Sequence, residues 1–501
     1  MKRSGYIMAI DQGTTSTRVI LFNHSGEVHS MASQEIKQFY PQPGWVEHDP
    51  VDIWQSVLHS AGEALRKGNA SIEEVKGIGI TNQRESTILW DRKTGAPVYN
   101  SICWACRRSA AICDQLKAAG HDPEIRKRTG LLIDAYFSAT KVKWIIDNVP
   151  GVRQRVERGE IAMGCIDSWI IWNLSGGKAH VTDVSNASRT LLLNIHSLTW
   201  DQDILNWLEI PEKVLPTVLP SSGLLATTDP AAFLGGTIPI AGDAGDQQAA
   251  TFGQACFRRG MAKNSYGTAL AVMLNIGEKA AEPSKNGLMV DVGWKIGKRI
   301  EYCLEGVIFN GGASVGWVKN GLRAIQSAAE CSVLAAKVPD TQGVYLVPAF
   351  TGLGSPYWDM YARGLIIGIT RGTTIEHIAR SALEAIAYQS RDVLMAMESD
   401  SGTKAQSLRV DGGGTQSDLL MQFQSDILGI PVERPVVTEM AALGACYLAG
   451  LGVGFWENQQ ELEQQWKLEK AFTPQMSADQ REELYRNWKR AVQRSFDWQA
   501  H

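Results

Sequence analysis

A short acidic and hydroxyl-rich motif near the start of the chain is suited to holding phosphate. Asp11 ends an apolar run, and Gly13 then allows the backbone to turn tightly. The backbone N–H groups and hydroxyls of such a turn can face one anion, and Arg18 could add a charged hydrogen bond. The hydroxyl residues of the turn are Thr14, Thr15 and Ser16. A plain hairpin turn without a ligand is the alternative interpretation.

A second motif places two acids between glycines directly after an apolar segment, in Gly242-Asp-Ala-Gly-Asp-Gln-Gln248. Asp246 could accept a proton from a substrate hydroxyl as a general base, if the fold brings the two within hydrogen-bond distance. A solvated Asp-Gly turn explains the same residues without chemistry.

A third motif has three glycines before a predicted helix, in Asp411-Gly-Gly-Gly-Thr415. Ser417 is a candidate N-cap of that helix. The glycines allow close approach of a ligand, and helix N-terminal amides can bind a nucleotide phosphate. A structural turn is again the alternative. Neither GxxxxGK[ST] nor GxGxxG occurs in the chain, so neither a P-loop nor a dinucleotide-binding fold is supported.

A fourth motif, Thr81-Asn-Gln-Arg-Glu85, is polar and follows a predicted strand. Arg84 supplies donors and Glu85 acceptors that suit a vicinal diol, and Trp104 and Tyr136 could cover its carbon side. Taken singly, such residues more often form a surface ion pair or part of a core.

An internal repeat indicates which elements position these motifs. Residues 6–22 have the pattern of a strand, a tight turn and a second strand, and residues 261–274 repeat it around Gly267-Thr268. The two Gly-Thr pairs lie about half the chain apart, as expected if two similar domains each present one hairpin to a shared cleft. Two unrelated turns are the alternative.

Other segments fit an α/β plan. Residues 75–80, 87–90 and 238–241 are predicted strands. Thr373 and Glu376 have capping-box spacing, and apolar residues then recur at helical period, so a core helix is predicted to begin there. The sequence therefore predicts an α/β protein with a duplicated two-domain fold.

Length and composition further restrict the number of domains and the kinds of partner. A chain of 501 residues exceeds what one core usually supports, and a boundary near residues 250–260 follows from the repeat. The net charge of -4 gives no electrostatic case for nucleic acid or an anionic membrane. No run is apolar enough for a membrane span, and the N-terminus does not resemble a signal peptide. We expect a cytoplasmic protein whose partners are small molecules.

The eight cysteines form no regular framework and are predicted to be reduced, buried thiols. Cys103 and Cys106 have metal-like spacing, but no second such pair and no nearby histidine completes a zinc site.

Together these motifs resemble the glycerol kinases of the FGGY carbohydrate kinase family, within the actin, hexokinase and Hsp70 ATPase superfamily. The similar segments include residues 11–16, 43–50, 79–85, 181–189, 245–249, 348–358 and 420–429. The resemblance implies two duplicated ribonuclease H-like domains around a central cleft. Residues 1–252 would bind polyol and phosphate, and residues 253–501 would bind the nucleotide. The implied reaction is ATP-dependent phosphorylation of glycerol to sn-glycerol 3-phosphate, in glycerol catabolism.

The resemblance also implies roles for single residues. Asp246 would be the catalytic base, and Asp11 would hold Mg²⁺, through water, beside ATP. The residues implied to bind the polyol are Arg84, Glu85, Trp104, Tyr136, Asp246 and Gln247. Those implied to bind the nucleotide are Thr14, Thr15, Ser16, Arg18, Thr268, Gly312, Gly316, Gly413 and Ser417. Dimers and tetramers are common in the family, so a homodimer or homotetramer is an expectation without a sequence signal of its own.

Some positions depart from the family pattern. Ala271 stands where an aromatic residue commonly covers the substrate, so a larger tetritol or a ketotriose such as dihydroxyacetone is an alternative substrate. Gly316 and Ser417 replace the usual Gln and Asn on the nucleotide side. Residues 232–237 lack the basic residues of a fructose 1,6-bisphosphate loop, so no inhibition through that loop is expected. A catalytically inactive regulatory paralogue is a further alternative.

Overall fold

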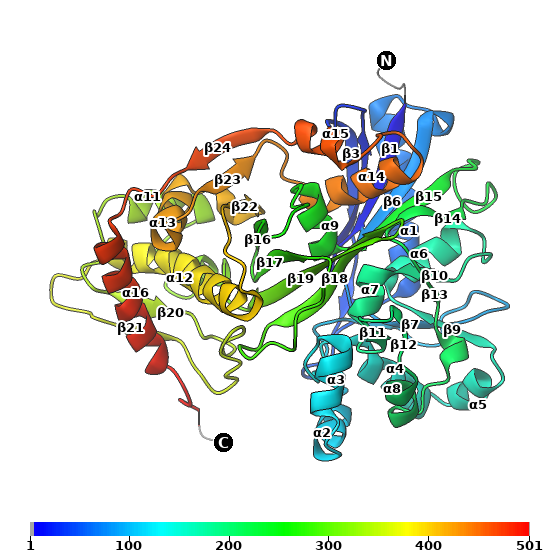
Figure 1. Cartoon of the computed structure of the whole chain (residues 1–501), viewed down its shortest axis with the longest axis horizontal. Helices are drawn as coiled ribbons and strands as arrows, with labels where there is room; N and C mark the ends of the chain where they lie inside the picture. The colour runs from blue at the N-terminus through cyan, green and yellow to red at the C-terminus, as the bar shows by residue number, and fades with distance from the viewer. Residues whose placement is uncertain (1–4, 500–501) are drawn as a thin grey trace.

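A single mixed sheet of thirteen strands runs through the molecule (Figure 1) in the computed structural model, which describes residues 5–499. Its strands, in spatial order, are β24 (Leu468–Phe472), β23 (Val432–Pro435), β22 (Leu408–Asp411), β16 (Ala262–Tyr266), β17 (Leu270–Gly277), β19 (Arg299–Ile308), β18 (Met289–Ile296), β14 (Ser222–Thr227), β15 (Pro239–Gly245), β6 (Val75–Asn82), β1 (Tyr6–Gln12), β2 (Ser16–Phe22) and β3 (Val28–Glu35).

The two halves of this sheet repeat one topology. In the first half, β1 pairs antiparallel with β2 and parallel with β6. In the second half, β16 pairs antiparallel with β17 and parallel with β22. Each hairpin has a further antiparallel neighbour, β3 beside β2 and β19 beside β17. The internal repeat predicted from the sequence, and with it the duplicated α/β fold, is confirmed.

The halves are joined by few backbone contacts. β14 and β18 meet in parallel through one residue pair, Ser222 and Ile296, and the Ser221 N–H donates to the Lys295 carbonyl at 2.9 Å. The thirteen strands therefore form a seven-stranded and a six-stranded unit that share one narrow junction.

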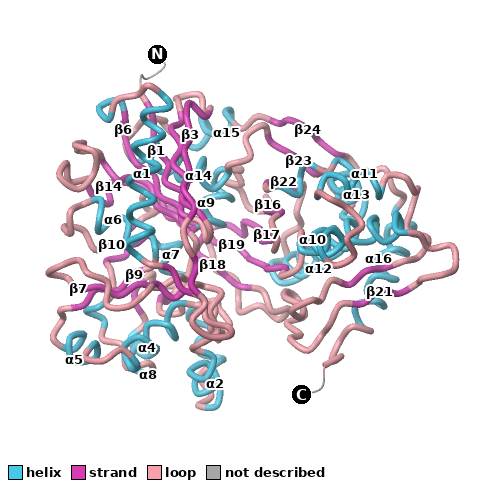
Figure 2. Tube along the Cα trace, turned by 180° about the vertical axis from the view of Figure 1, so that it is seen from behind, coloured by secondary structure: helices cyan, strands magenta, loops and turns pink. Residues whose placement is uncertain are grey.

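Sixteen α-helices of the described residues cover the sheet and extend it. They are α1 (Pro50–Gly68), α2 (Ala110–Ala118), α3 (Asp122–Thr129), α4 (Ser138–Asn148), α5 (Val152–Glu157), α6 (Ile166–Leu174), α7 (Val184–Ser188), α8 (Gln202–Trp207), α9 (Asp246–Gly253), α10 (Ala313–Asn320), α11 (Ala328–Ala335), α12 (Ile375–Ser401), α13 (Asp418–Leu428), α14 (Met440–Gly452), α15 (Gln459–Gln465) and α16 (Ala478–Gln493). Figure 2 shows α2, α4, α5 and α8 gathered at one end of the first half.

Short strands complete the loops between these elements. They are β4 (Gln38–Phe39), β5 (Glu47–His48), β7 (Ile88–Asp91), β8 (Ser101–Ile102), β9 (Ile161–Gly164), β10 (Val181–Asp183), β11 (Leu193–Asn194), β12 (Thr199–Trp200), β13 (Thr217–Leu219), β20 (Tyr345–Val347) and β21 (Leu365–Ile367). The predicted strands at residues 75–80, 87–90 and 238–241 correspond to β6, β7 and β15, each with ends shifted by a few residues.

Local sequence explains where the main helices begin. Asp49 caps α1 by accepting from the Val51 N–H, and proline occupies the first turn. The predicted start of α12 is wrong by one residue. Thr374 is the N-cap, and His377 rather than Glu376 completes the capping box because its Nδ1 accepts from the Thr374 N–H at 3.1 Å.

Helix α14 comes late in the chain yet packs against the first half, over β1, β6, β14 and β15 and beside α9. Glycines permit this approach. A Cβ on Gly79 of β6 would lie 2.1 Å from the Ala445 carbonyl oxygen, and one on Gly444 would lie 1.8 Å from that of Ala249. Residues near both ends of the chain therefore share one hydrophobic core.

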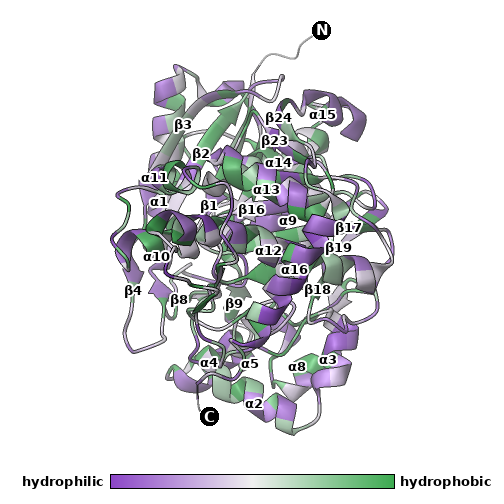
Figure 3. Cartoon of the chain, turned by 90° about the vertical axis from the view of Figure 1, so that its left-hand side faces the viewer, coloured by the Kyte–Doolittle hydropathy of each residue, from purple (hydrophilic) through white to green (hydrophobic). Residues whose placement is uncertain are grey.

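Hydropathy follows this arrangement. Figure 3 shows hydrophobic residues concentrated on the central strands and hydrophilic residues on outer helices such as α15 and α16. The eight cysteines all lie among the described residues as buried free thiols, as predicted. Between residues 5 and 499, none of the helices combines the length and apolar character that crossing a bilayer requires.

Candidate active site

The ends of three neighbouring parallel strands bring the N-terminal motifs together. Asp11 at the end of β1 is in register with Thr81 of β6, which is in register with Ala244 of β15. Because parallel strands end at the same edge of a sheet, the residues that follow β6 and β15 lie beside Asp11. This edge therefore carries Asp11, Arg84, Glu85 and Asp246, as the sequence predicted separately for each motif.

The turn between β1 and β2 is held in one shape by its neighbours. The Gly13 N–H donates to the Ser16 carbonyl at 2.9 Å. The Thr14 carbonyl accepts from His48 Nε2 at 2.8 Å, and its hydroxyl accepts from Trp104 Nε1 at 2.9 Å. Thr15 in the middle of the turn stays exposed, and Arg18 pairs across the hairpin with Asp11. The turn is rigid and open on its outer side.

Asp11 has an unusual electrostatic environment. Burial raises the pKa of its carboxyl to about 6, an effect that the Arg18 charge opposes and that Asp246 and Glu439 reinforce. A bound cation would relieve this repulsion. A single carboxylate with room for water suits Mg²⁺, which keeps several waters and takes its other ligands from substrate phosphates.

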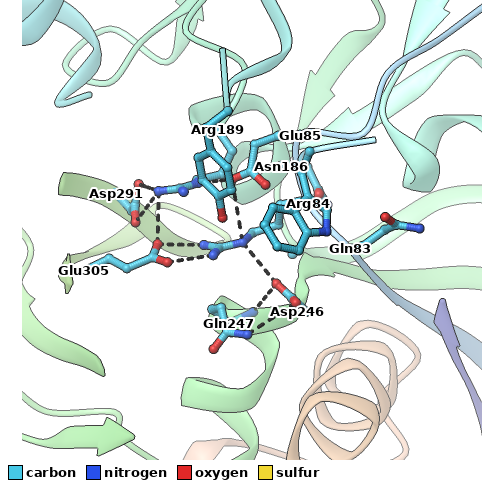
Figure 4. A network of polar contacts seen from close by, with 12 residues as sticks. Gln83, Arg84, Glu85, Asn186, Arg189, Asp246, Gln247, Asp291 and Glu305 are labelled. Atoms are coloured by element: carbon cyan, nitrogen blue, oxygen red, sulfur yellow. Dashed lines mark hydrogen bonds and ion pairs between the residues drawn. The ribbon is translucent and has the colours of Figure 1, made fainter. Parts of the chain in front are cut away.

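Arg84 orders this edge of the sheet by holding two acids. Its guanidinium donates to both oxygens of Glu305, at 2.7 and 2.6 Å, and its Nε lies 3.0 Å from Asp246 Oδ1 (Figure 4). The Arg84 stem runs over Gly245, where a Cβ would come within 2.6 Å of it. The glycine before Asp246 is therefore needed to let the arginine reach its partners.

Glu85 is held by a second buried arginine. Arg189, which follows α7, donates from Nε to Glu85 Oε1 at 2.6 Å and from Nη1 to Asp291 Oδ1 at 2.8 Å (Figure 4). Glu85 itself has a φ of 61°, a conformation that a non-glycine residue adopts only when its surroundings impose it. The surrounding ion pairs supply that constraint.

The buried acids of this network differ in how readily they ionise. Burial raises the pKa of Asp291 to about 8, although the Arg189 charge opposes it. Burial also acts on Glu305, but the charges of Arg189 and Arg84 together hold the pKa of that carboxyl below its usual value. Glu305 is therefore the permanent counter-ion of both arginines.

Asp246 is the most accessible acid of the network. It begins α9, and its side chain is 34% exposed, whereas those of Arg84 and Glu85 are 4% and 1% exposed. The Gln247 N–H donates to Asp246 Oδ1 at 2.8 Å and Gln247 Nε2 to Oδ2 at 3.3 Å. Arg84 and Gln247 thus fix the direction of a carboxylate that solvent or a ligand can reach.

Two half-buried aromatic rings lie beside this edge. Trp104 and Tyr136 meet edge to face with ring centroids 5.7 Å apart. The Tyr136 ring lies over Arg189, 5.5 Å from its guanidinium carbon. Together the rings supply an apolar wall beside the polar groups of Arg84 and Glu85.

The second half of the sheet positions the residues that the sequence predicted to bind the nucleotide. The Thr268 carbonyl, in the turn after β16, accepts from the Gly311 N–H at 3.0 Å, just before α10. A Cβ on Gly316 of α10, or on Gly413 after β22, would meet no atom within 4 Å, so both positions border open space. Gly312 is packed instead, since its Cβ would lie 2.6 Å from the Gly267 oxygen.

Ser417 is the N-cap of α13, as predicted. Its hydroxyl accepts from the Leu420 N–H at 3.2 Å and from the Ser332 hydroxyl of α11 at 2.7 Å. The hydroxyl is thus committed to structure, and the open space lies beside the neighbouring glycine turn.

Four charged residues of this site were not predicted as functional: Arg189, Lys263, Asp291 and Glu305. All four are buried, and their local sequences contain other polar or charged residues, so no apolar run singled them out. Their burial is what reveals them, because a charge is rarely buried without a partner. Among residues 5–499 no cluster of three or more His, Cys, Asp or Glu side chains could hold a metal on its own.

Comparison with known proteins agrees with this geometry. Residues 6–253 match the N-terminal domain and residues 262–453 the C-terminal domain of the FGGY family of carbohydrate kinases. The chain is 57% identical to a glycerol kinase of Caldanaerobacter subterraneus, over 98% of this chain and 99% of that relative. It is 58% identical to glycerol kinase 2 of Thermotoga maritima, over 99% of both chains.

Solved structures give the same result. The crystal structure of Plasmodium falciparum glycerol kinase with ADP superposes with a TM-score of 0.92 at 35% identity, covering 98% of each chain. Gluconate kinase of Lactobacillus acidophilus, at 22% identity, shares the fold with a TM-score of 0.86 and 97% coverage of each chain. The predicted two-domain fold of the actin-like ATPase type is confirmed. The chain belongs to the FGGY family of carbohydrate kinases.

Proposed function

We propose that the protein transfers the γ-phosphoryl group of ATP to glycerol and forms sn-glycerol 3-phosphate, the activity of an ATP:glycerol 3-phosphotransferase. Curated glycerol kinases 57% and 58% identical over nearly the whole chain support this function. The structural observation that carries it is Asp246, an accessible carboxylate held by Arg84 and Gln247 between a diol-binding edge and a phosphate-binding turn.

Asp246 acts as the general base in this proposal. Its carboxylate takes the proton of the terminal hydroxyl as that oxygen forms a bond to the γ-phosphorus and the bond to the ADP oxygen breaks. Because phosphoryl transfer depends mostly on positioning and electrostatics, the fixed direction of Asp246 is its main contribution. Asp11 would hold, through water, a Mg²⁺ ion bound with ATP, and that ion would neutralise charge on the phosphates.

The polyol would lie against the Arg84–Glu85 edge. Arg84 donates to its hydroxyls, Glu85 accepts from them, and Gln247 can do both. The rings of Trp104 and Tyr136 would cover its carbon atoms. Since both charged side chains are already anchored to Glu305 and Arg189, little ordering remains to be done when the substrate binds.

The nucleotide would bridge the two halves of the sheet. Thr14, Thr15, Ser16 and Arg18 would hold its phosphates from one hairpin and Thr268 from the other. Gly312, Gly316, Gly413 and Ser417 would surround the rest of the nucleotide, where Gly316 and Gly413 border open space. A related structure solved with ADP, at 35% identity, supports this role.

Another small polyol or ketotriose, such as erythritol, threitol or dihydroxyacetone, remains the second candidate substrate because of the small side chain at Ala271. An inactive regulatory paralogue fits less well, since the Asp246 site retains all the acids and donors that the reaction needs. The cytoplasmic location and a homodimeric or homotetrameric state remain predictions.

Turnover with a polyol panel tests the proposal. We expect purified protein with MgATP to release ADP when glycerol is added. Asp246→Asn should lower kcat by about a hundredfold or more, since general-base catalysis typically contributes that much. Asp52→Asn, a change at an exposed acid of α1, is the matched control and should leave turnover intact. Glycerol-dependent turnover that survives in D246N would contradict the assignment of Asp246 as the base. Turnover of a tetritol but not of glycerol would show that the tetritol is the substrate.

A further inference from the structure

Lys263 is a buried cation next to the catalytic edge. It lies on β16, its side chain is fully buried, and its Nζ donates to Gln247 Oε1 and to Ser265 Oγ, the latter at 2.9 Å. Both hydrogen-bond partners are neutral. The charges of Asp411, Glu305 and Asp246 favour the ammonium form against the cost of burying it. Lys263 is therefore a buried cation between acids of both halves of the molecule.

The chemistry of lysine fixes the orientation of the Gln247 amide. An ammonium group has only donors, so the side-chain atom of Gln247 that faces it must be the amide oxygen. The amide NH₂ is then turned toward Asp246, where Nε2 lies 3.3 Å from Oδ2. Reversing the amide would set donors against the ammonium group and an oxygen against a carboxylate. Lys263 thereby determines which end of Gln247 meets the base.

A second buried lysine shows that this arrangement is not a general feature of the fold. Lys141 of α4 is also fully buried, but it donates to the main-chain carbonyls of Tyr136 and Phe137. Lys141 therefore holds local backbone in place. Lys263 instead contacts the side chain of Gln247 in α9, which is adjacent in sequence to Asp246.

Lys263 also faces the nucleotide side. Ser265, its second partner, is in parallel register with Asp411, the last residue before the glycine turn at 412–414. Lys263 thus lies between the base and that turn.

We infer that Lys263 is a positioning residue for phosphoryl transfer, which through the Gln247 amide holds the Asp246 carboxylate in the direction needed to receive the substrate proton. This inference rests on the proposed function and adds to it a residue that does not itself touch the substrate.

The pH dependence of kcat and KM in Lys263→Met tests this inference. We expect kcat to fall about tenfold to a hundredfold, with a smaller change in the KM for MgATP, because a misdirected base affects the transition state more than nucleotide binding. The acid limb of the kcat profile should move to higher pH, because a carboxylate that loses a nearby positive charge and a donor ionises less readily. A lysine that only supports the fold would not move that limb.

A double-mutant cycle separates action through Gln247 from direct action. If Lys263 works through the amide, K263M should cost less than about threefold in a Gln247→Ala background, because the two changes then remove one interaction. Additive losses would overturn the inference. Lys404→Met, at an exposed lysine, is the control and should match wild type.

Gln247→Glu is a second variant that leaves Lys263 in place. A glutamate accepts from the lysine but has no side-chain N–H for Asp246, so the same loss and the same shift of the acid limb are expected. Wild-type kinetics in Q247E would refute the role of the amide. This test remains available even if K263M does not fold.

These experiments use whichever polyol of the panel wild type turns over fastest. Failure of glycerol alone then counts against the proposed function and not against Lys263. A crystal structure of K263M adds a test without turnover: we expect the Gln247 amide to leave Asp246, and an unchanged contact would overturn the inference.

Discussion

Ala271 is a small residue on the face of the sheet that carries Glu305 and Lys263. It lies on β17 two residues before Met273, which is in register with Lys263 on one side and Glu305 on the other. Residues two apart in a strand share a face, so Ala271 points to the side of Glu305 and Lys263. Its own neighbours in register are Ser265 and Val307, neither of which is aromatic.

Substrate length should respond to a larger side chain at this position. We expect Ala271→Phe to lower kcat/KM for erythritol and threitol about tenfold more than for glycerol, because a ring fills space that only a fourth carbon would use. Differences of one carbon in a pocket are typically worth 1–3 kcal/mol. The ratio of kcat/KM values measured on one preparation is its own control. An equal loss for all substrates would show that Ala271 is remote from the polyol.

The site residues that could be predicted from the sequence are those that follow strand ends. Asp11, Arg84, Glu85 and Asp246 stand in short polar motifs directly after apolar runs, and parallel strands bring such motifs to one edge. Glu305, by contrast, lies within strand β19, far in sequence from Arg84. No local pattern specifies a pair so distant, so the network around Arg189 and Glu305 became visible only in three dimensions.

Among the elements, α14 shows most directly how glycines set packing distance. It lies against β6 and α9, where Gly79 and Gly444 replace side chains with backbone contact. The sequence of α14 is apolar on nearly all sides, which predicts burial but not against which half of the sheet. The hairpins at residues 6–22 and 261–274 were predictable because their pattern is local and repeated.

Gly444→Ala should destabilise the protein. The new Cβ would lie 1.8 Å from the Ala249 carbonyl oxygen, so α9 and α14 must move apart. We expect the free energy of unfolding to fall by about 2–3 kcal/mol, the upper part of the usual cost of overpacking, as measured by urea denaturation.

Gly62→Ala is the matched control for that experiment. Gly62 lies within α1, where a Cβ would meet no atom within 4 Å. Alanine there should stabilise the protein by about 0.5–1 kcal/mol, because it favours helix over unfolded chain. If the two substitutions changed the free energy of unfolding equally, close packing of α14 would not explain the destabilisation by Gly444→Ala.

At the scale of the whole molecule, three buried acids below the active site make stability depend on pH. Asp183 is well satisfied, with hydrogen bonds from Ser185, Asn186 and Ser221. Asp167 Oδ1 and Asp243 Oδ2 are buried without a donor from any other residue, and the two carboxyls interact with each other. Burial raises the pKa of Asp167 to about 7 and that of Asp243 well above its usual value. The charges of Asp167 and Asp183 raise the pKa of Asp243 further, whereas a hydrogen bond with Asp243 lowers the pKa of Asp167.

Stability should therefore fall as pH rises. An acid whose pKa is higher in the folded state binds more protons when folded, so ionising it between the unfolded and folded pKa values costs free energy. We expect Asp243→Asn to flatten this fall between pH 5.5 and 8 and to stabilise the protein at pH 8 by about 1–3 kcal/mol, since one pKa unit corresponds to about 1.4 kcal/mol. Urea titrations across that range measure it.

Asp229→Asn provides the comparison. Asp229 is a surface acid whose pKa lies below its usual value because Lys178 donates to it. It is ionised in both states above pH 5.5, so its loss should leave the slope of stability against pH unchanged. If D243N and wild type gave parallel curves, the acids around Asp243 would not be the source of the pH dependence.

The place of α14 in the chain also constrains how the protein can be made. A ribosome completes β1, β6 and β15 long before it reaches residues 440–452, which cover them. Until those residues emerge, the sheet face around Gly79 and Gly242 has no lid, and a nascent chain exposes apolar surface that favours aggregation. Translation that stops before α14 thus yields a product that lacks part of its first half as well as the end of its second.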